Sequence, residues 1–297
     1  MLYAASFEAF LKLEKGLSKA SIDAYLQDLR KLQSFVEILE MNCTVAQLKL
    51  EDLQAFISYL NSLELSLNSQ ARIISSLKGF YKYLMIEDLI QDDPSLLLSA
   101  PKSARTLPSV LSSEAIEKML ESIDHSKKEG IRNRAIIEVL YACGLRVSEL
   151  TDLKLSNVYF EIGYIKVIGK GNKERIIPIG EEAIKHLQFY LQDRQTLQNI
   201  KQDSEDIVFL NRRGGQLSRN MIFMIVKDLA KKAGIKHKVS PHTFRHSFAT
   251  HLIEGGANLR VVQDLLGHSS IITTEIYTHL DMNYLKETIQ MFHPRNK

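Results

Sequence analysis

The sequence has few cysteines and no long apolar run, and each lack excludes a class of protein. Cys43 and Cys143 are the only cysteines among 297 residues, so a disulfide-rich scaffold is excluded, and two buried free thiols are favoured over one disulfide. No segment approaches the roughly 18 consecutive apolar residues of a membrane-spanning helix. The first residues lack a cationic start followed by an apolar stretch, which favours a cytoplasmic protein with no membrane partner.

Charge of either sign is not in large excess, but it is unevenly divided along the chain. The net charge is +3 and hydrophobic residues make up 45%, as in a globular chain of two ordinary domains. Residues 1–100 contain 9 Lys/Arg and 13 Asp/Glu, a balance of −4. The remaining residues contain 29 Lys/Arg and 22 Asp/Glu, a balance of +7. The second part is therefore better suited to a polyanion such as nucleic acid.

Residues 1–97 are predicted to form a bundle of four or five short helices with no catalytic constellation. Their apolar residues recur at helical spacing, and Ser18 is placed as a cap before one such series. A first helix has Phe7, Phe10, Leu11 and Leu13 near one face. Asp92-Asp93-Pro94 ends the last helix of the bundle.

A linker at residues 98–109 precedes a second domain at 110–297. Pro101 and Pro108 bracket a polar stretch, which is typical of a linker. The second domain begins with helices, including an apolar one at Arg134–Ala142. It then has two β-branched runs, 164–168 and 174–179, that predict a hairpin. The expected fold is mainly α, with a helical bundle followed by an α+β domain that contains a small β-hairpin.

Reactive side chains gather in four segments of the second domain, and each segment alone has a plain interpretation. Arg146 with Glu149 is typical of a surface ion pair. A Lys between two glycines is typical of a solvated turn, and a lone Tyr is typical of side-chain packing. A phosphate-binding loop is disfavoured because a strand follows that Lys. Zinc binding by His242 and His246 is disfavoured because no cysteine lies nearby and the zinc-protease Glu is replaced by Thr243. Taken together, the segments supply Arg146, Lys170, His242, Arg245, His268 and Tyr277 in order.

This set matches the needs of a phosphodiester exchange. The guanidinium fork can hold two phosphate oxygens and stabilise the charge that develops on them. A phenol with a pKa near 10 needs a cationic surround or an accepting imidazole to attack at neutral pH. The departing 5′ oxygen needs a proton, which an ammonium group can donate. Because arginines supply the charge, neither a metal nor another cofactor is predicted.

The motifs that contain these residues resemble the tyrosine recombinase (phage integrase) family, and within it the bacterial Xer recombinases. They are Gly144-Leu145-Arg146, Gly169–Arg175, His242–His246, Leu266-Gly267-His268 and Ile276–His279. The resemblance covers nearly the whole chain. It implies that the first domain is a SAM-like core-binding domain and the second a catalytic domain, which together clamp duplex DNA.

The resemblance also implies a role for each candidate residue. Arg146 and Arg245 would bind the scissile phosphate, and Lys170 would be the general acid for the leaving 5′-hydroxyl. His242 would assist proton transfer at the nucleophile. His268 would donate a hydrogen bond to the phosphate, and Tyr277 would form a 3′-phosphotyrosyl intermediate.

The resemblance further implies a tetrameric synapse in which strands are exchanged in pairs. The apolar segment after Tyr277, which contains Leu285 and Ile289, would dock on a neighbouring protomer. The expected task is chromosome dimer resolution at a dif-like site, with a second, XerC-like recombinase and an FtsK-type translocase as partners. The alternatives are an integrase of a mobile element, a type IB topoisomerase, and a DNA-binding protein without catalysis. The complete set of six residues disfavours the last.

The assignment of Lys170 as general acid leads to a test, because Lys173 lies on the same turn. Lys170→Ala should slow cleavage of ordinary DNA by about 10²–10⁴-fold, the usual contribution of general acid catalysis. On DNA whose bridging 5′ oxygen is replaced by sulfur, the leaving group needs no proton, and the variant should recover most of its rate. The measurement is single-turnover cleavage of both substrates.

Arg146→Ala is the control that sulfur should not rescue, since the phosphate charge still has to be stabilised. Lys173→Ala should weaken DNA binding, more so at high salt, with an unchanged preference between the two substrates. Rescue of Lys173→Ala by the sulfur substrate would show that the general acid is Lys173 and not Lys170.

Overall fold

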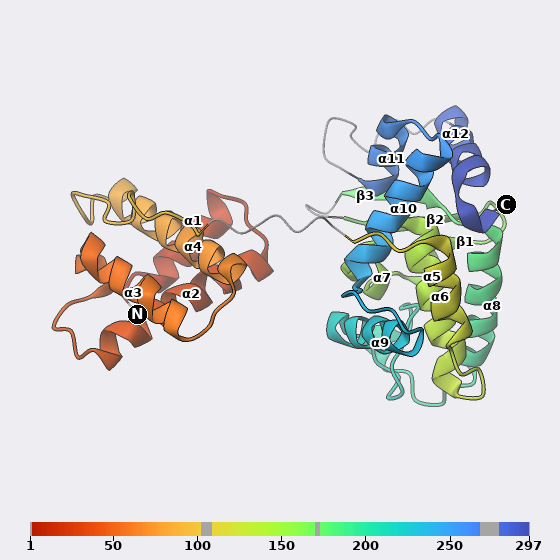
Figure 1. The fold of residues 1–297 in the computed structure, drawn as a ribbon, viewed down its shortest axis with the longest axis horizontal. Helices are drawn as coiled ribbons and strands as arrows, with labels where there is room; N and C mark the ends of the chain where they lie inside the picture. Colours follow the sequence, from red (N-terminus) through yellow and green to blue (C-terminus); the bar gives the residue numbers. More distant parts are fainter. Residues whose placement is uncertain (1, 102–108, 170–172, 268–278, 297) are drawn as a thin grey trace. The chain divides into compact units, whose positions relative to one another are not determined.

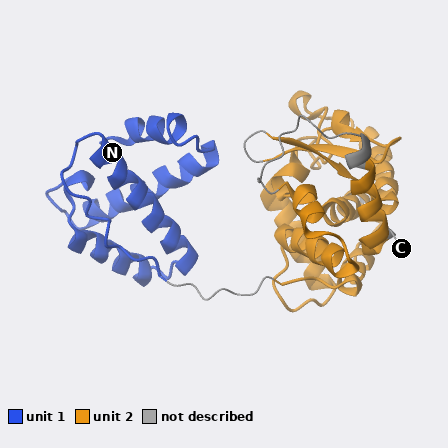
Figure 2. Cartoon of the chain, turned by 90° about the horizontal axis from the view of Figure 1, so that it is seen from above, with its two compact units in different colours: residues 1–106 blue, residues 107–297 orange. Residues whose placement is uncertain are grey.

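The chain divides into two units, residues 1–106 and 107–297, and the division falls inside the predicted linker (Figure 2). The computed structural model describes residues 2–101, 109–169, 173–267 and 279–296. Lys170, His268 and Tyr277 lie outside the described residues. Each unit buries its own apolar cluster.

The first unit is a helical bundle, as predicted (Figure 1). Its helices are α1 (Ala4–Leu13), α2 (Lys19–Ile38), α3 (Leu50–Ser62) and α4 (Leu67–Ile86). Ser18 caps α2 by accepting a hydrogen bond from the Ser21 amide. The placement of Leu13 on the apolar face of α1 is wrong, because it is 78% exposed. It follows Phe7 by six residues, which on a helix is a rotation of about 600°, or about 120° away from Phe7, and this places it outside the buried face.

A buried charge joins the two long helices of this bundle. The Asp28 carboxylate of α2 is buried. It accepts hydrogen bonds from the Arg72 guanidinium and, at 2.9 Å, from the Ser76 hydroxyl, both on α4. A buried carboxylate is tolerated only when it is paired in this way.

The second unit packs helices around a small antiparallel sheet. The strands are β1 (Val158–Tyr159), β2 (Tyr164–Ile168) and β3 (Glu174–Pro178), in the order β1-β2-β3. In the register of β2 and β3, Ile165 pairs with Ile177 and Val167 with Arg175. The predicted hairpin is confirmed. The strand β1 was not predicted, because two residues are too few to show an alternating pattern.

Helices of the second unit cover this sheet and one another (Figure 1). They are α5 (Ser113–Glu121), α6 (Lys128–Cys143), α7 (Val147–Thr151), α8 (Glu181–Gln195), α9 (Arg219–Lys232), α10 (Pro241–Gly255), α11 (Leu259–Leu266) and α12 (His279–Phe292). The helix α6 runs through the core, and its residues 135–143 are all buried. It begins at Lys128 and not at Arg134 as predicted, because its first turns are polar and show no apolar pattern.

The C-terminal segment packs on its own unit in this chain. Leu285 and Ile289 of α12 join the core, and His293 is fully buried. The Arg295 guanidinium forms ion pairs with Glu117 of α5 and Glu138 of α6. Docking of this segment on a neighbouring protomer therefore remains a prediction about the assembled protein.

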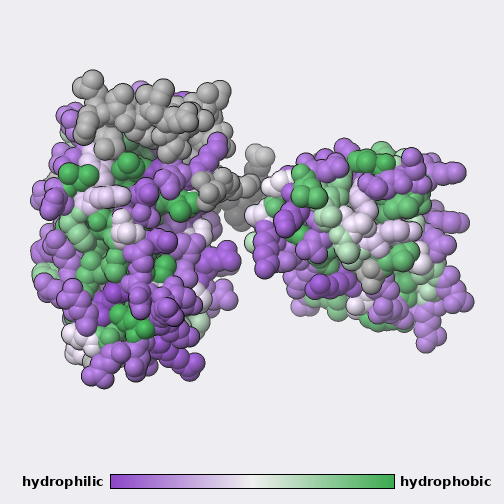
Figure 3. All heavy atoms as spheres, turned by 180° about the vertical axis from the view of Figure 1, so that it is seen from behind, coloured by the Kyte–Doolittle hydropathy of each residue, from purple (hydrophilic) through white to green (hydrophobic). Residues whose placement is uncertain are grey.

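None of the helices that the structure describes combines the length and apolar composition of a membrane span. On the face shown in Figure 3, apolar side chains lie in small groups among hydrophilic ones. Isolated apolar groups of this kind are usual on globular proteins.

Gly144 ends α6 in a conformation that leads to a stability test. Its φ is +57°, and an added Cβ would lie 2.5 Å from Cδ1 of Phe248. Gly144→Ala should therefore lower the free energy of unfolding by about 2–5 kcal/mol, from left-handed strain plus overpacking. Gly234 also has a positive φ, of +71°, but has open space at its Cβ position. Gly234→Ala should thus lose only about 1–2 kcal/mol. Equal losses in urea unfolding would show that Phe248 moves aside at little cost.

Candidate active site

Arg146 and Glu149 are placed by the sharp turn between α6 and α7. Gly144 ends α6, and Arg146 is the residue that caps α7. The Glu149 carboxylate accepts hydrogen bonds of 2.8 Å from the Arg146 amide and from its Nη1 atom. Glu149 is only 3% exposed. The interpretation of this segment as a surface ion pair is therefore wrong, because the carboxylate belongs to the interior.

Arg175 of β3 is the second partner of this buried carboxylate. Its Nη1 and Nη2 atoms donate to the two Glu149 oxygens at 2.6 and 2.8 Å. The sequence prediction did not include Arg175 among the functional residues. A signal was present, since strand alternation places Arg175 on the same inward face as Ile177. A cation on such a face requires a buried anion nearby.

Arg245 approaches the same carboxylate from α10. It is 9% exposed, and its Nη1 atom donates to the Gly144 carbonyl at 2.8 Å and lies 3.9 Å from Glu149 Oε2. Burial and then the charge of Arg146 lower the pKa of Arg245 to about 10, and the charge of Glu149 opposes this shift. The guanidinium therefore stays charged at neutral pH.

The last turn of α11 holds all three arginines by consecutive carbonyl groups. Arg175 Nε donates to the Leu265 carbonyl at 3.1 Å, and Arg245 Nη2 to the Leu266 carbonyl at 2.5 Å. Arg146 Nη2 donates to the next carbonyl, that of Gly267, at 3.4 Å. The carbonyl end of a helix carries partial negative charge, which suits a cluster of cations.

His242 lies in the first turn of the helix that carries Arg245. Its side chain is exposed, and it lines one hollow together with Arg245 and His246. Of the six predicted residues, the structure thus brings Arg146 and Arg245 together and places His242 on the helix of Arg245. In the part of the chain that the structure describes, no three His, Cys, Asp or Glu side chains converge as a metal site.

The arrangement is that of an anion site. Three arginines and one carboxylate leave a net charge of +2, and the more exposed guanidinium, that of Arg146, faces a second hollow that Ser148 and Gly169 also line. A phosphate oxygen could accept N–H groups here from side chains that are already held in place. Such preorganised donors stabilise charge that develops in a transition state.

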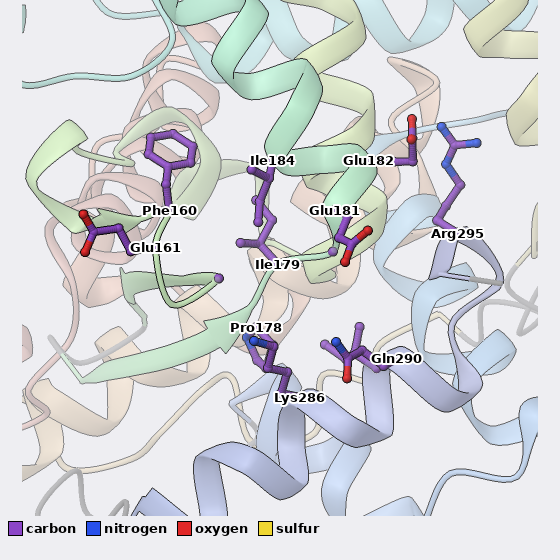
Figure 4. A pocket seen from close by; sticks show the side chains of 13 residues that line it. Phe160, Glu161, Pro178, Ile179, Glu181, Glu182, Ile184, Lys286, Gln290 and Arg295 are labelled. Carbon is purple, nitrogen blue, oxygen red and sulfur yellow. The ribbon is translucent and has the colours of Figure 1, made fainter.

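A larger pocket lies elsewhere in the unit, and its lining does not match this chemistry (Figure 4). It lies between α12, the end of β3 and the start of α8, and includes Glu181, Lys286 and Arg295. Lys286 Nζ donates to the Ile162 carbonyl at 3.5 Å. These groups belong to the packing of the C-terminal segment, and the arginine cluster is not among its lining residues.

Comparison with known proteins decides the family. Residues 109–284 match the model described as "Phage integrase family", and residues 4–88 match "Phage integrase, N-terminal SAM-like domain". The chain belongs to the phage integrase family. It is a site-specific tyrosine recombinase, an enzyme that cleaves and rejoins DNA, built from a SAM-like helical domain and a catalytic domain.

Relatives of this recombinase place it with the XerD proteins, which confirms the resemblance to the Xer group. It is 43% identical to Tyrosine recombinase XerD of Listeria monocytogenes serotype 4b over 289 residues, 97% of each chain. It is 41% identical to that of Staphylococcus aureus, over 96% of each chain. A solved structure of XerH bound to palindromic difH DNA after cleavage matches with 28% identity and a TM-score of 0.70, covering 97% of this chain and 84% of the other.

The buried carboxylate of the recombinase leads to a pH test. Burial raises the pKa of Glu149, but the hydrogen bonds and charge of Arg175 and the hydrogen bonds of Arg146 outweigh this and hold the pKa below its usual value. The contribution of ionised Glu149 to the free energy of unfolding is therefore present at neutral pH. It is lost as the pH falls below about 4 and through the folded-state pKa of Glu149. Glu149→Gln should be less stable than the parent at pH 7.

The gap in melting temperature between parent and variant should narrow as the pH falls through the folded-state pKa of Glu149, because both proteins then carry a neutral side chain at this position. Glu205→Gln changes an exposed carboxylate outside the cluster, and it should follow the parent curve throughout. A gap of constant size for Glu149→Gln would mean that Glu149 does not titrate in this range.

Proposed function

We propose that this recombinase carries out Xer-type chromosome dimer resolution, cutting and rejoining duplex DNA at a dif-like site through a 3′-phosphotyrosyl link to Tyr277. One observation carries the proposal: Arg146 and Arg245 are held around the buried Glu149 carboxylate as a net positive site for a phosphate. Relatives named XerD, and the XerH complex with difH DNA, support the choice of target.

Binding of the scissile phosphate is assigned to Arg146 and Arg245. Their guanidinium groups can each donate two N–H groups to phosphate oxygens. Their carbonyl and carboxylate partners orient them before DNA binds, so little reorganisation is needed as charge grows in the transition state.

The strand exchange then needs a nucleophile, an acid and an acceptor for the nucleophile's proton. The Tyr277 hydroxyl attacks phosphorus in line, with His242 assisting the transfer of its proton. The 5′ oxygen leaves with a proton from Lys170, while His268 donates a hydrogen bond to the phosphate. The phosphotyrosyl ester keeps the energy of the broken bond, so a 5′-hydroxyl from a partner strand reverses the step without ATP. No metal or other cofactor takes part.

The assembly that this reaction requires is a tetramer on two DNA duplexes in the cytoplasm. A second, XerC-like recombinase would supply the alternate protomers, and an FtsK-type translocase would act with them. The segment that contains Leu285 and Ile289 would pass between neighbours. Such an exchange replaces one set of buried apolar contacts by an equivalent set, so little hydrophobic free energy is lost.

The test is covalent capture on nicked duplexes that contain a dif-like site. Loss of the short fragment beside the nick prevents religation, so the recombinase should accumulate as a denaturant-resistant adduct with DNA. Addition of a XerC-like partner should increase the yield. Tyr277→Phe should bind the same duplex nearly as well and form no adduct, since phosphate contacts elsewhere supply most of the affinity.

Two outcomes would contradict the proposal. Adduct formation by Tyr277→Phe would identify a different nucleophile. Equal adduct yields on dif-like and on scrambled duplexes, with the partner present, would exclude a dif-like target. A mobile-element integrase would instead select the ends or the attachment site of its own element.

A further inference from the structure

We propose that Arg175 is a positioning residue of the recombination reaction, which orients Arg146 and Arg245 through Glu149 and ties the β2–β3 hairpin to the last turn of α11. The proposal rests on the phosphate-binding role proposed above for Arg146 and Arg245. Arg175 is 6% exposed, and the three hydrogen bonds described above all go to protein groups. It is therefore placed behind the phosphate site and acts through other residues.

The first link runs through the Glu149 carboxylate. Four N–H groups donate to its two oxygens, two from Arg146 and two from Arg175. Loss of Arg175 would leave each oxygen with one of these donors. The buried carboxylate would then either draw in Arg245, now 3.9 Å away, or take up a proton. The first response moves a group that is assigned to the phosphate, and the second removes the negative charge that orients Arg146.

The second link runs to the segments on either side of the cluster. An added Cβ at Gly169 would lie 3.4 Å from Arg175 Nη1, and one at Gly267 would lie 2.9 Å from Arg175 Cδ. These glycines directly precede Lys170 and His268 in the chain. The Arg175 side chain thus packs against the residue before each of these two proposed catalytic residues, and glycine at both positions permits the close approach.

The geometry requires a guanidinium and not merely a positive charge. The two Nη atoms of Arg175 match the two oxygens of Glu149, while Nε points to the Leu265 carbonyl. A lysine ammonium is a point charge on a flexible stem and cannot reproduce this fork. Arg175→Lys therefore keeps the positive charge but loses the fork of hydrogen-bond donors. Arg175→Met loses both the charge and the donors while it keeps most of the side-chain volume.

The experiment measures single-turnover cleavage of the nicked dif-like duplex, together with DNA affinity and melting temperature. Arg175→Met and Arg175→Lys should both cleave about 10²-fold more slowly per folded molecule, since small displacements of catalytic groups cost about this much. DNA affinity should change by less than about threefold, because Arg175 is not a phosphate contact.

A pH–rate profile between about pH 5.5 and 8 distinguishes positioning from simple stability. Glu149 faces Arg146, which caps α7, as well as Arg175 of β3 and Arg245 of α10. Of the groups that lower the pKa of Glu149, Arg175 contributes most. Without Arg175 the pKa of Glu149 should rise, so the ratio of variant to parent rates should acquire a titration step. In a Glu149→Gln background the step should vanish, and Arg175→Met should slow cleavage by a smaller factor than it does in the parent, because neighbouring residues that act together are not additive.

Arg194 offers a matched control in the same unit. It is a buried arginine, 7% exposed, that donates to the carbonyls of Ser204, Glu205 and Ile207 and to no carboxylate in the described contacts. Arg194→Met should lower the melting temperature and leave the cleavage rate per folded molecule and its pH profile unchanged.

The proposal is overturned if Arg175→Met cleaves at the parent rate per folded molecule with a constant rate ratio over pH, or if DNA binding alone is weakened. Arg146→Ala on the same duplex separates this failure from failure of the proposed function. Loss of cleavage in Arg146→Ala with normal cleavage in Arg175→Met rejects only the positioning role. Normal cleavage in Arg146→Ala rejects the phosphate site itself.

Discussion

One buried negative charge, that of Glu149, organises the catalytic unit of this recombinase. Removing a carboxylate from water costs several kcal/mol unless hydrogen bonds and opposite charges compensate. Here Arg146 and Arg175 donate to both of its oxygens, and Arg245 lies nearby. The carboxylate in turn allows three cations to lie close together without DNA. It therefore sets both the net charge of the cluster and the orientation of its guanidinium groups.

The ends of two helices lie next to this charge cluster and provide hydrogen-bond acceptors to its arginines. The helix α6 ends at Gly144, whose carbonyl accepts from Arg245. The C-terminal turn of α11 offers three carbonyls in succession to Arg146, which caps α7, and to arginines of β3 and α10. Backbone and side-chain acceptors thus hold the guanidinium groups, and a substrate does not have to order them. Such prior orientation is what electrostatic preorganisation requires of the proposed phosphate site.

Much of the architecture was predictable because burial imposes a period on the sequence. The helical first unit, the β2–β3 hairpin and the Ser18 cap follow from spacing and local propensity. Errors occurred where the local pattern carries little information. The strand β1 has only two residues, the polar first turns of α6 hide its start at Lys128, and Leu13 extends an apolar face by one residue too many.

The sequence by itself determined which chemical groups the catalytic unit contains, because Arg146, His242 and Arg245 occur in motifs whose residue types suit a phosphodiester. The roles of Lys170, His268 and Tyr277 rest on the same motifs. Only the tertiary structure decided that Glu149 is buried and that Arg175 binds it, because these residues lie 26 positions apart, on α7 and β3, and meet only in the folded unit. Local patterns report the neighbours of a residue along the chain, whereas the environment of a charge depends on segments that meet only after folding.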